Sequence, residues 1–165
     1  MKRVFTQTFG VVGAIIECDG LFVLVKEAYR KGPDYGKWNH PAGWIDPGEN
    51  PIEAVKREVH EETGSLFTPT GILGIYSLVR SDIKDSYKGL SPHGIKIIFR
   101  GVLSKDQGIL SDDVSEVRWF SRKEIEAMDQ ATLRDDDIKQ MVRDYYGGQY
   151  FPLCLFRHTV QEKRG

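Results

Sequence analysis

The sequence has few cysteines, almost no net charge and no long apolar run. Its two cysteines, Cys18 and Cys154, are too few for a disulfide framework in a chain of 165 residues and indicate reduced thiols. A net charge of -1 gives no bulk attraction for nucleic acid or anionic membranes. The longest apolar runs, VVGAII and LFVLV, are too short to cross a bilayer, and MKRVFTQTFG lacks the apolar segment of a signal peptide. We therefore expect a cytoplasmic protein with neither nucleic acid nor a membrane as partner.

The length and composition suit one globular domain, which we expect to span residues 1–165. The chain is 40% hydrophobic and 28% charged, as in ordinary soluble proteins. Two apolar strands meet at Asp19-Gly20, a strong hairpin-turn signal. Further strands are predicted in GILGIYSLVR, IKIIFRGVL and SEVRWF, and helices after Ser121 and over about 134–146. Because strands and helices are mixed around one core, the fold class is α/β or α+β.

A helix over residues 51–63 has the clearest ends. Asn50 is a favourable N-cap and Pro51 suits the first helical position. Glu53 completes a capping-box pattern, and Gly64 supplies the C-terminal stop. The stretch between the first hairpin and this helix reads YRKGPDYGKWNH followed by PAGWIDPGE. It has no periodicity and is expected to be loop.

The end of this helix gathers three carboxylates. Glu58, Glu61 and Glu62 are neighbours at helical spacing, where like charges cost about 0.2–0.5 kcal/mol per pair. On a helical wheel they border the buried face, so they can meet residues of another element. Such carboxylates suit a hard divalent cation such as Mg²⁺ or Mn²⁺. The alternative is a solvated acidic face, which most charge runs are.

The sequence from Gly43 to Ser65 resembles the Nudix box, the loop–helix–loop signature of Nudix hydrolases. The signature reads Gly, five residues, Glu, seven residues, then Arg-Glu-apolar-any-Glu-Glu-any-Gly-apolar. GWIDPGENPIEAVKREVHEETG matches every specified position, with Glu49 and Arg57 in register. Ser65 alone departs, replacing an aliphatic residue that packs behind the loop.

The resemblance implies a fold and an activity. The Nudix fold is a mixed β-sheet sandwiched between helices (α/β/α); here the box would occupy 43–65 and a C-terminal extension about 132–165. Nudix enzymes are metal-dependent pyrophosphohydrolases that cleave a diphosphate bond in a nucleoside diphosphate derivative. By the same mapping Glu58 and Glu62 would be the main Mg²⁺ or Mn²⁺ ligands, with the Gly43 carbonyl. Glu61 would be a further ligand or the base that activates water.

Other box and loop residues receive roles by the same resemblance. Arg57 would be structural, pairing with Glu49 or Glu61 to fix the loop against the helix. A further catalytic acid often comes from the loop before the last strand. Asp113 matches that position, with Glu116 as the other candidate and a solvated acidic turn as the alternative.

Basic and aromatic residues outside the box are weaker candidates for substrate contacts. Five basic residues near the long polar stretch could attract phosphate or be ordinary surface charge: Arg80, Lys84, Lys88, His93 and Lys96. Trp44 and Tyr35 could stack on a base or belong to the core. His40 is expected to be packed or at the surface, with catalysis as the alternative. Trp119 lies in a strand pattern and is expected in the core.

The sequence does not identify the substrate. WN-x-PAG is similar to small pyrophosphatases acting on nucleoside triphosphates and a pyrimidine pyrophosphate, whereas PAG-x-x-DPGE is similar to ADP-ribose pyrophosphatases. A non-catalytic nucleotide sensor is the alternative function, although such proteins usually have an eroded box. An isopentenyl diphosphate isomerase-like enzyme would need an active-site cysteine, and neither cysteine is well placed. The tail, 147–165, either caps the core or packs in a homodimer.

Overall fold

The computed structural model describes residues 8–83, 91–105 and 108–161. No helix within these ranges combines the length and the apolar composition that a membrane crossing requires. In chain order the elements are β1 (Phe9–Cys18), β2 (Leu21–Glu27), β3 (Trp38–Asn39), β4 (Ala42–Trp44), α1 (Pro51–Thr63), β5 (Phe67–Val79), β6 (His93–Leu103), β7 (Val114–Ser121), α2 (Arg122–Ala127), α3 (Asp137–Tyr146) and the 3₁₀ helix η1 (Leu153–Leu155).

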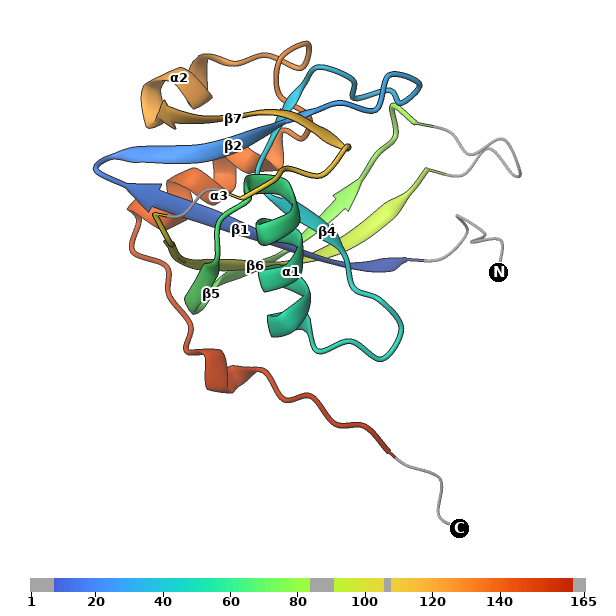
Figure 1. Ribbon diagram of the computed structural model, residues 1–165, viewed down its shortest axis with the longest axis vertical. Helices are drawn as coiled ribbons and strands as arrows, with labels where there is room; N and C mark the ends of the chain where they lie inside the picture. The colour runs from blue at the N-terminus through green and yellow to red at the C-terminus, as the bar shows by residue number, and fades with distance from the viewer. Residues whose placement is uncertain (1–7, 84–90, 106–107, 162–165) are drawn as a thin grey trace.

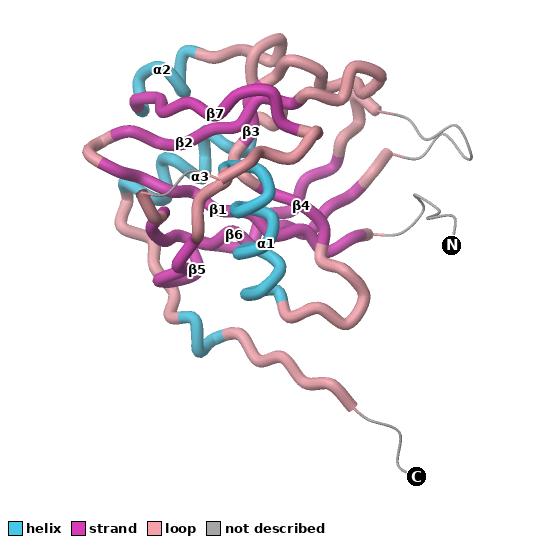
Figure 2. Tube along the Cα trace, in the orientation of Figure 1, coloured by secondary structure: helices cyan, strands magenta, loops and turns pink. Residues whose placement is uncertain are grey.

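The strands form one mixed sheet around β1. β1 is parallel to β6 and antiparallel to β2 and β4. β5 pairs antiparallel with β6, while β3 and β7 pair antiparallel with β2. The main path is therefore β3-β2-β1-β6-β5, from which β4 and β7 branch. Figures 1 and 2 show α1 in front of the strands and α3 behind them, which is the expected α/β arrangement.

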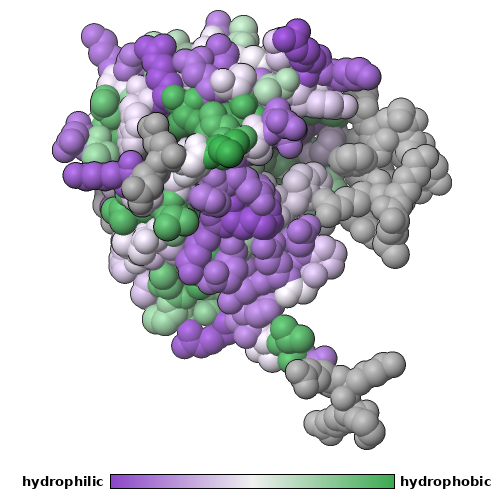
Figure 3. All heavy atoms as spheres, viewed as in Figure 1, coloured by the Kyte–Doolittle hydropathy of each residue, from purple (hydrophilic) through white to green (hydrophobic). Residues whose placement is uncertain are grey.

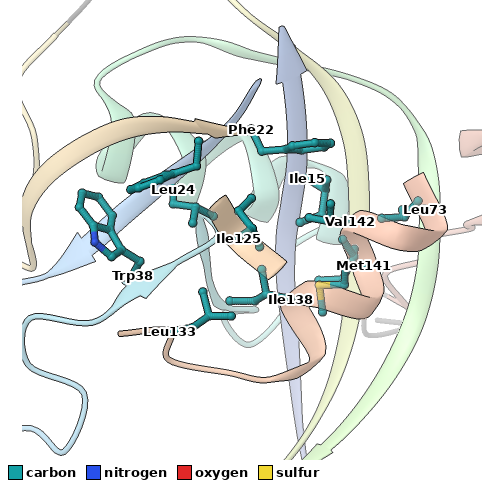
Figure 4. Close-up of a cluster of buried hydrophobic side chains, with 12 residues drawn as sticks. Ile15, Phe22, Leu24, Trp38, Leu73, Ile125, Leu133, Ile138, Met141 and Val142 are labelled. Atoms are coloured by element: carbon teal, nitrogen blue, oxygen red, sulfur yellow. The ribbon is translucent and has the colours of Figure 1, made fainter. Parts of the chain in front are cut away.

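Both faces of the sheet are buried, each under a helix. Successive strand residues point to opposite faces, so adjacent Ile15 and Ile16 enter different cores. The core under α3 is drawn in Figure 4 and includes Phe22, Leu24, Leu73, Ile138, Met141 and Val142. The core under α1 includes Val12, Ala14, Val23, Val55, Val59 and Phe99. Two-sided burial explains why the strands read as continuous apolar runs.

Helix α1 ends where its sequence predicts. The Asn50 side chain accepts a hydrogen bond from Ile52 N at 3.0 Å, and Gly64 adopts the left-handed conformation at φ 70°. The expected capping box is wrong: the Glu53 carboxylate bonds Lys56 Nζ at 2.8 Å, one turn along the helix. An exposed lysine within reach offers the carboxylate a charged partner in place of the cap.

Two details differ from the sequence expectation because of contacts between distant residues. The last helix begins at Asp137 and not at about 134, since Asp135 and Asp137 both bind the buried Lys96. Trp119 is 37% exposed and not a core residue. It lies on β7, which is paired on one side only, and lines a surface cavity of about 630 Å³. The supposed loop before α1 also contains the short strands β3 and β4.

The C-terminal segment is hydrogen-bonded to the edge strand β5 and then extends away from the body of the protein. Phe151 and Ile72 exchange two backbone hydrogen bonds of 2.8 Å. Leu153 and Phe156 pack against the core under α1, as the core-capping alternative predicts. Beyond them the chain runs outward (Figure 1), with Val160 exposed.

Candidate functional site

The Glu58 carboxylate lies against the backbone of β4 at Gly43. A Cβ atom added to Gly43 would lie 2.0 Å from Glu58 Cδ, well inside any real contact distance. Strand β4 is fixed by pairing with β1, where Gly43 lies opposite Val12. Glycine is therefore required here by close approach and not by its backbone angles.

Glu62 lies one helical turn further and is bound to the same strand. Its Oε2 accepts the backbone N–H of Ala42 at 2.9 Å. Burial raises the pKa of Glu62 well above its ordinary value, and the negative charges of Glu27 and Glu58 add to that rise. Burial also raises the pKa of Glu58, although Arg57 opposes the rise. Within the described part of the chain, Glu62 has no ion-pair partner.

Arg57 connects the helix to the loop that precedes it. Its guanidinium donates to both oxygens of Glu49 at 2.9 Å and to the Trp44 carbonyl at 3.1 Å. It also donates to Glu58 at 2.7 Å and lies 3.4 Å from Glu61. Arg57 therefore contacts both of its expected partners, Glu49 and Glu61. The same network holds the Glu58 carboxylate in one orientation.

The donor set suits a divalent cation completed by other ligands. Among the described residues, no three His, Cys, Asp or Glu side chains come close enough to hold a metal ion alone. Mg²⁺ commonly takes only one or two carboxylates and completes its shell with water and substrate phosphate oxygens. Glu58 and Glu62 supply two desolvated carboxylates, and at Glu62 the charge of Arg134 opposes the repulsion from Glu27 and Glu58. The residues present therefore fit such an ion.

The remaining acidic candidates are more exposed. The Glu61 side chain is 48% exposed, and Figure 3 shows hydrophilic residues gathered over α1 on this face. Asp113 is exposed on the loop before β7, where its carbonyl accepts the Ala28 N–H. Glu116 pairs with Lys26 at 3.5 Å on the β7–β2 ladder. The structure thus joins Glu61 to the Arg57 network and leaves Asp113 and Glu116 outside it.

A cavity of about 360 Å³ has Gly43 in its wall. Its wall contains all three substrate candidates, Trp44, Arg80 and Lys96. Trp44 packs on Phe9 with ring centroids 4.4 Å apart, which gives the cavity an apolar side. Ligand sites are typically apolar hollows of this size with a few polar groups.

The cations of this cavity already have carboxylate partners. Arg80 binds Asp34 at 2.8 Å and Asp82 at 2.7 Å. Lys96 is 4% exposed and binds Asp135 at 2.7 Å, as well as Asp137. Both cations therefore stand in the cavity wall as members of internal ion pairs.

The other expected contact residues are scattered. Tyr35 is exposed, with the Arg30 guanidinium 5.7 Å from its ring centroid, and is not part of the cavity wall. His93 bonds Ser77 at 2.8 Å. His40 is buried in the cavity wall. Lys84 and Lys88 lie outside the described residues.

Comparison with known proteins places these features in a family. The family model described as NUDIX domain matches residues 6–144. This chain belongs to the Nudix family. The phosphatase NudJ of Escherichia coli K12 is 27% identical over 146 residues, which cover 86% of each chain. A Nudix hydrolase structure from Nitrosomonas europaea is 33% identical with a TM-score of 0.76 and covers 93% of this chain and 98% of its own. The MutT protein of Methanosarcina mazei is 27% identical, TM-score 0.70, covering 89% and 99%.

These matches confirm the Nudix fold and an enzyme of the Nudix hydrolase class. The match to the Nudix box is therefore part of a similarity that extends over most of the chain and is not a short chance match. In this Nudix hydrolase, Gly43, Glu58 and Glu62 meet where strand β4 crosses helix α1, as the spacing of the box requires.

Sequence reasoning missed several cavity and site residues. Asn39 lies in the WNHPAG stretch but was not among the predicted site residues. Its position next to the aromatic residue Trp38, which the structure buries, was a usable signal. Glu27 approaches Glu62 from the end of β2, and Arg134 binds Glu27 from far along the chain. No local pattern announces the last two, because only the folded sheet brings them together.

Proposed function

We propose that this Nudix hydrolase is a metal-dependent pyrophosphohydrolase. It cleaves a diphosphate bond in a nucleoside diphosphate derivative, such as a nucleoside triphosphate or ADP-ribose, by water attack on phosphorus. The observation that carries the proposal is the desolvated pair Glu58 and Glu62, held against the backbone of β4 at Gly43 and Ala42. A carboxylate pair of this kind is stabilised when a cation binds.

Glu58 and Glu62 would hold Mg²⁺ or Mn²⁺, together with the Gly43 carbonyl. A bound ion of this kind neutralises a diphosphate and lowers the pKa of an attacking water. Glu61 lies on the exposed side of the same helix turn, where it can serve as a further ligand or accept the proton of the water. Arg57 acts by orienting Glu58 and the loop residue Glu49.

The general base is proposed to be Glu61, with Asp113 or Glu116 as the loop alternative. Glu61 adjoins the proposed ligand Glu62 and lies 3.4 Å from the Arg57 guanidinium, which favours Glu61 over the loop acids. The hydrogen bond between Ala28 and Asp113 uses the backbone carbonyl of Asp113. The Asp113 carboxylate is therefore free to turn toward substrate. Glu116 is tied to Lys26.

The 360 Å³ cavity beside Gly43 would receive the rest of the substrate. Trp44 offers a ring face, while Arg80 and Lys96 shape the wall through their ion pairs. We further propose a single cytoplasmic domain over 1–165 with a C-terminal extension from about 132. Neither nucleic acid nor a membrane is a proposed partner, and the exposed tail residues Leu155 and Val160 would form the contact surface if the protein forms a homodimer.

A substrate panel tests the function. Nucleoside triphosphates, ADP-ribose, dinucleoside polyphosphates and nucleotide sugars are incubated with the protein in Mg²⁺, with Mn²⁺, and with EDTA. We expect at least one compound to be hydrolysed at a diphosphate bond, with the activity lost in EDTA. No turnover of any compound by folded, metal-binding protein would contradict the proposal and support a nucleotide sensor.

A further inference from the structure

The C-terminal end of helix α1 receives hydrogen bonds from the segment that leads into β7. Ser111 N donates to the Glu61 carbonyl at 2.8 Å. Gly108 N donates to the Gly64 carbonyl at 2.6 Å. The last carbonyls of a helix have no partner within the helix, so a distant segment here supplies donors that α1 lacks. Figure 1 shows this segment passing the end of α1 on its way into β7.

Gly64 and Gly108 approach each other so closely that neither has room for a side chain. A Cβ atom added to Gly108 would lie 2.9 Å from the Gly64 carbonyl oxygen, and one added to Gly64 would lie 2.7 Å from the Gly108 oxygen. Both obstacles are backbone atoms, which cannot rotate away as the end of a flexible side chain can. Gly64 also needs its left-handed backbone at φ 70°, whereas for Gly108 the close approach is the requirement.

The same segment is held at its other end. The Asp113 carbonyl accepts the Ala28 N–H at 2.8 Å, directly after the end of β2. The stretch 108–113 therefore connects helix α1 to strand β2. It carries Asp113, the loop candidate for the general base, and it binds the helix end that carries Glu61, the first candidate.

The end of α1 needs such support because of its carboxylates. Helix ends fray, and Glu61 and Glu62 belong to the last turn before Gly64. Negative side chains near a helix C-terminus oppose the helix dipole, and Glu58 repels both of the others at helical spacing. Both effects favour unwinding of this turn. The N–H groups of the segment oppose unwinding, since they bond carbonyls at the same helix end.

We propose that Gly108 and Ser111 are positioning residues for the metal-holding carboxylates. By bonding the end of α1 they keep its last turn wound, so that Glu62 stays against β4 and Glu61 stays beside it. The consequence for metal binding rests on the proposed function, because Glu62 is a proposed metal ligand. The holding of the helix end does not depend on that function and is measured separately.

Amide hydrogen exchange and Mn²⁺ binding test the two parts. Gly108→Ala places a Cβ against the Gly64 carbonyl, and Ser111→Pro removes the N–H that Glu61 accepts. In both variants we expect the amides of Glu61 and Glu62 to exchange about tenfold faster than in wild type, or more. Mn²⁺ added alone and followed by electron paramagnetic resonance should bind about tenfold more weakly, or worse.

A matched glycine variant and a melting curve separate positioning from a general effect on folding. Gly147 is exposed after α3, and its added Cβ would meet no atom closer than 3.3 Å. Gly147→Ala should therefore match wild type in exchange and in Mn²⁺ affinity. If Gly108→Ala does not fold, Ser111→Pro decides alone.

Two results would overturn the inference. One is wild-type exchange of the helix end in the folded variants, and the other is faster exchange with wild-type Mn²⁺ affinity. If wild type itself binds no Mn²⁺, the proposed function fails, and faster exchange in the variants still supports the holding of the helix end by Gly108 and Ser111.

Discussion

The Glu62 carboxylate accepts the backbone N–H of Ala42 at 2.9 Å, which bonds helix α1 directly to strand β4. The next residue, Gly43, lies against the other carboxylate, that of Glu58. Strand and helix are thus fixed to each other at the point where the two negative charges converge. Any change that separates them should remove activity before it unfolds the protein.

Gly43→Ala tests this close approach. The new Cβ would lie 2.0 Å from Glu58 Cδ, so the carboxylate or the strand must shift. We expect kcat of the hydrolysis to fall by about 100-fold, with a loss of about 1–3 kcal/mol in the free energy of unfolding from overpacking. Gly94→Ala is the stability control, because its Cβ would meet only Val11 Cγ2 at 3.5 Å. Wild-type kinetics in Gly43→Ala would contradict the arrangement.

Arg57→Lys tests the orienting role of the guanidinium. A lysine cannot reproduce the paired bonds to Glu49 together with those to Glu58 and the Trp44 carbonyl. Chemical denaturation should show a loss of about 2 kcal/mol. Arg143→Lys is matched, since Arg143 also makes paired bonds, to the Glu126 carboxylate, but on the surface. Arg143→Lys should lose clearly less stability than Arg57→Lys because exposed ion pairs contribute little, and equal losses would refute a special role for Arg57.

Asp135→Asn tests the buried ion-pair network of the cavity wall. Asp135 binds both Arg80 and Lys96, and neutralising it leaves these cations under-compensated. Breaking a buried pair of this kind costs about 3 kcal/mol or more, so the melting temperature should fall clearly. Glu53→Gln removes an exposed partner of Lys56 and should change stability by less than about 1 kcal/mol. A stable Asp135→Asn would show that the network is not needed for folding.

His40 should make the protein sensitive to acid. Its pKa is lowered from 6.5 to about 3, so between these values the unfolded chain binds a proton that the folded protein does not. Stability from this group is therefore complete above pH 6.5 and is lost as the pH falls toward 3, with a slope of up to about 1.4 kcal/mol per pH unit. His40→Phe should remove that part of the slope in denaturation curves taken from pH 7 to 4. An unchanged slope would mean that His40 is accessible to protons in the folded state.

Features that depend on residues close together in the chain could be predicted from the sequence. Asn50 and Gly64 bound helix α1 because caps act on the backbone within a few residues. The spacing of the box brought Gly43, Glu58 and Glu62 together for a similar reason, since a strand and the next helix are joined by a short loop.

Contacts across the chain were out of reach of such patterns. From the sequence Arg80 was either a phosphate-attracting cation or ordinary surface charge, and its ion-pair partners Asp34 and Asp135 lie 46 and 55 residues away. The same kind of contact moved the start of the last helix to Asp137.

The most direct measurement is the Mg²⁺-dependent rate of diphosphate hydrolysis by Glu62→Gln beside Glu53→Gln, with the best substrate of the panel. Both changes neutralise one carboxylate on α1, but Glu62 is bound to β4 whereas Glu53 faces solvent. We predict that Glu62→Gln lowers kcat by about 1000-fold or more, while Glu53→Gln stays within about twofold of wild type. Comparable rates for the two variants would contradict the metal-holding role of Glu62.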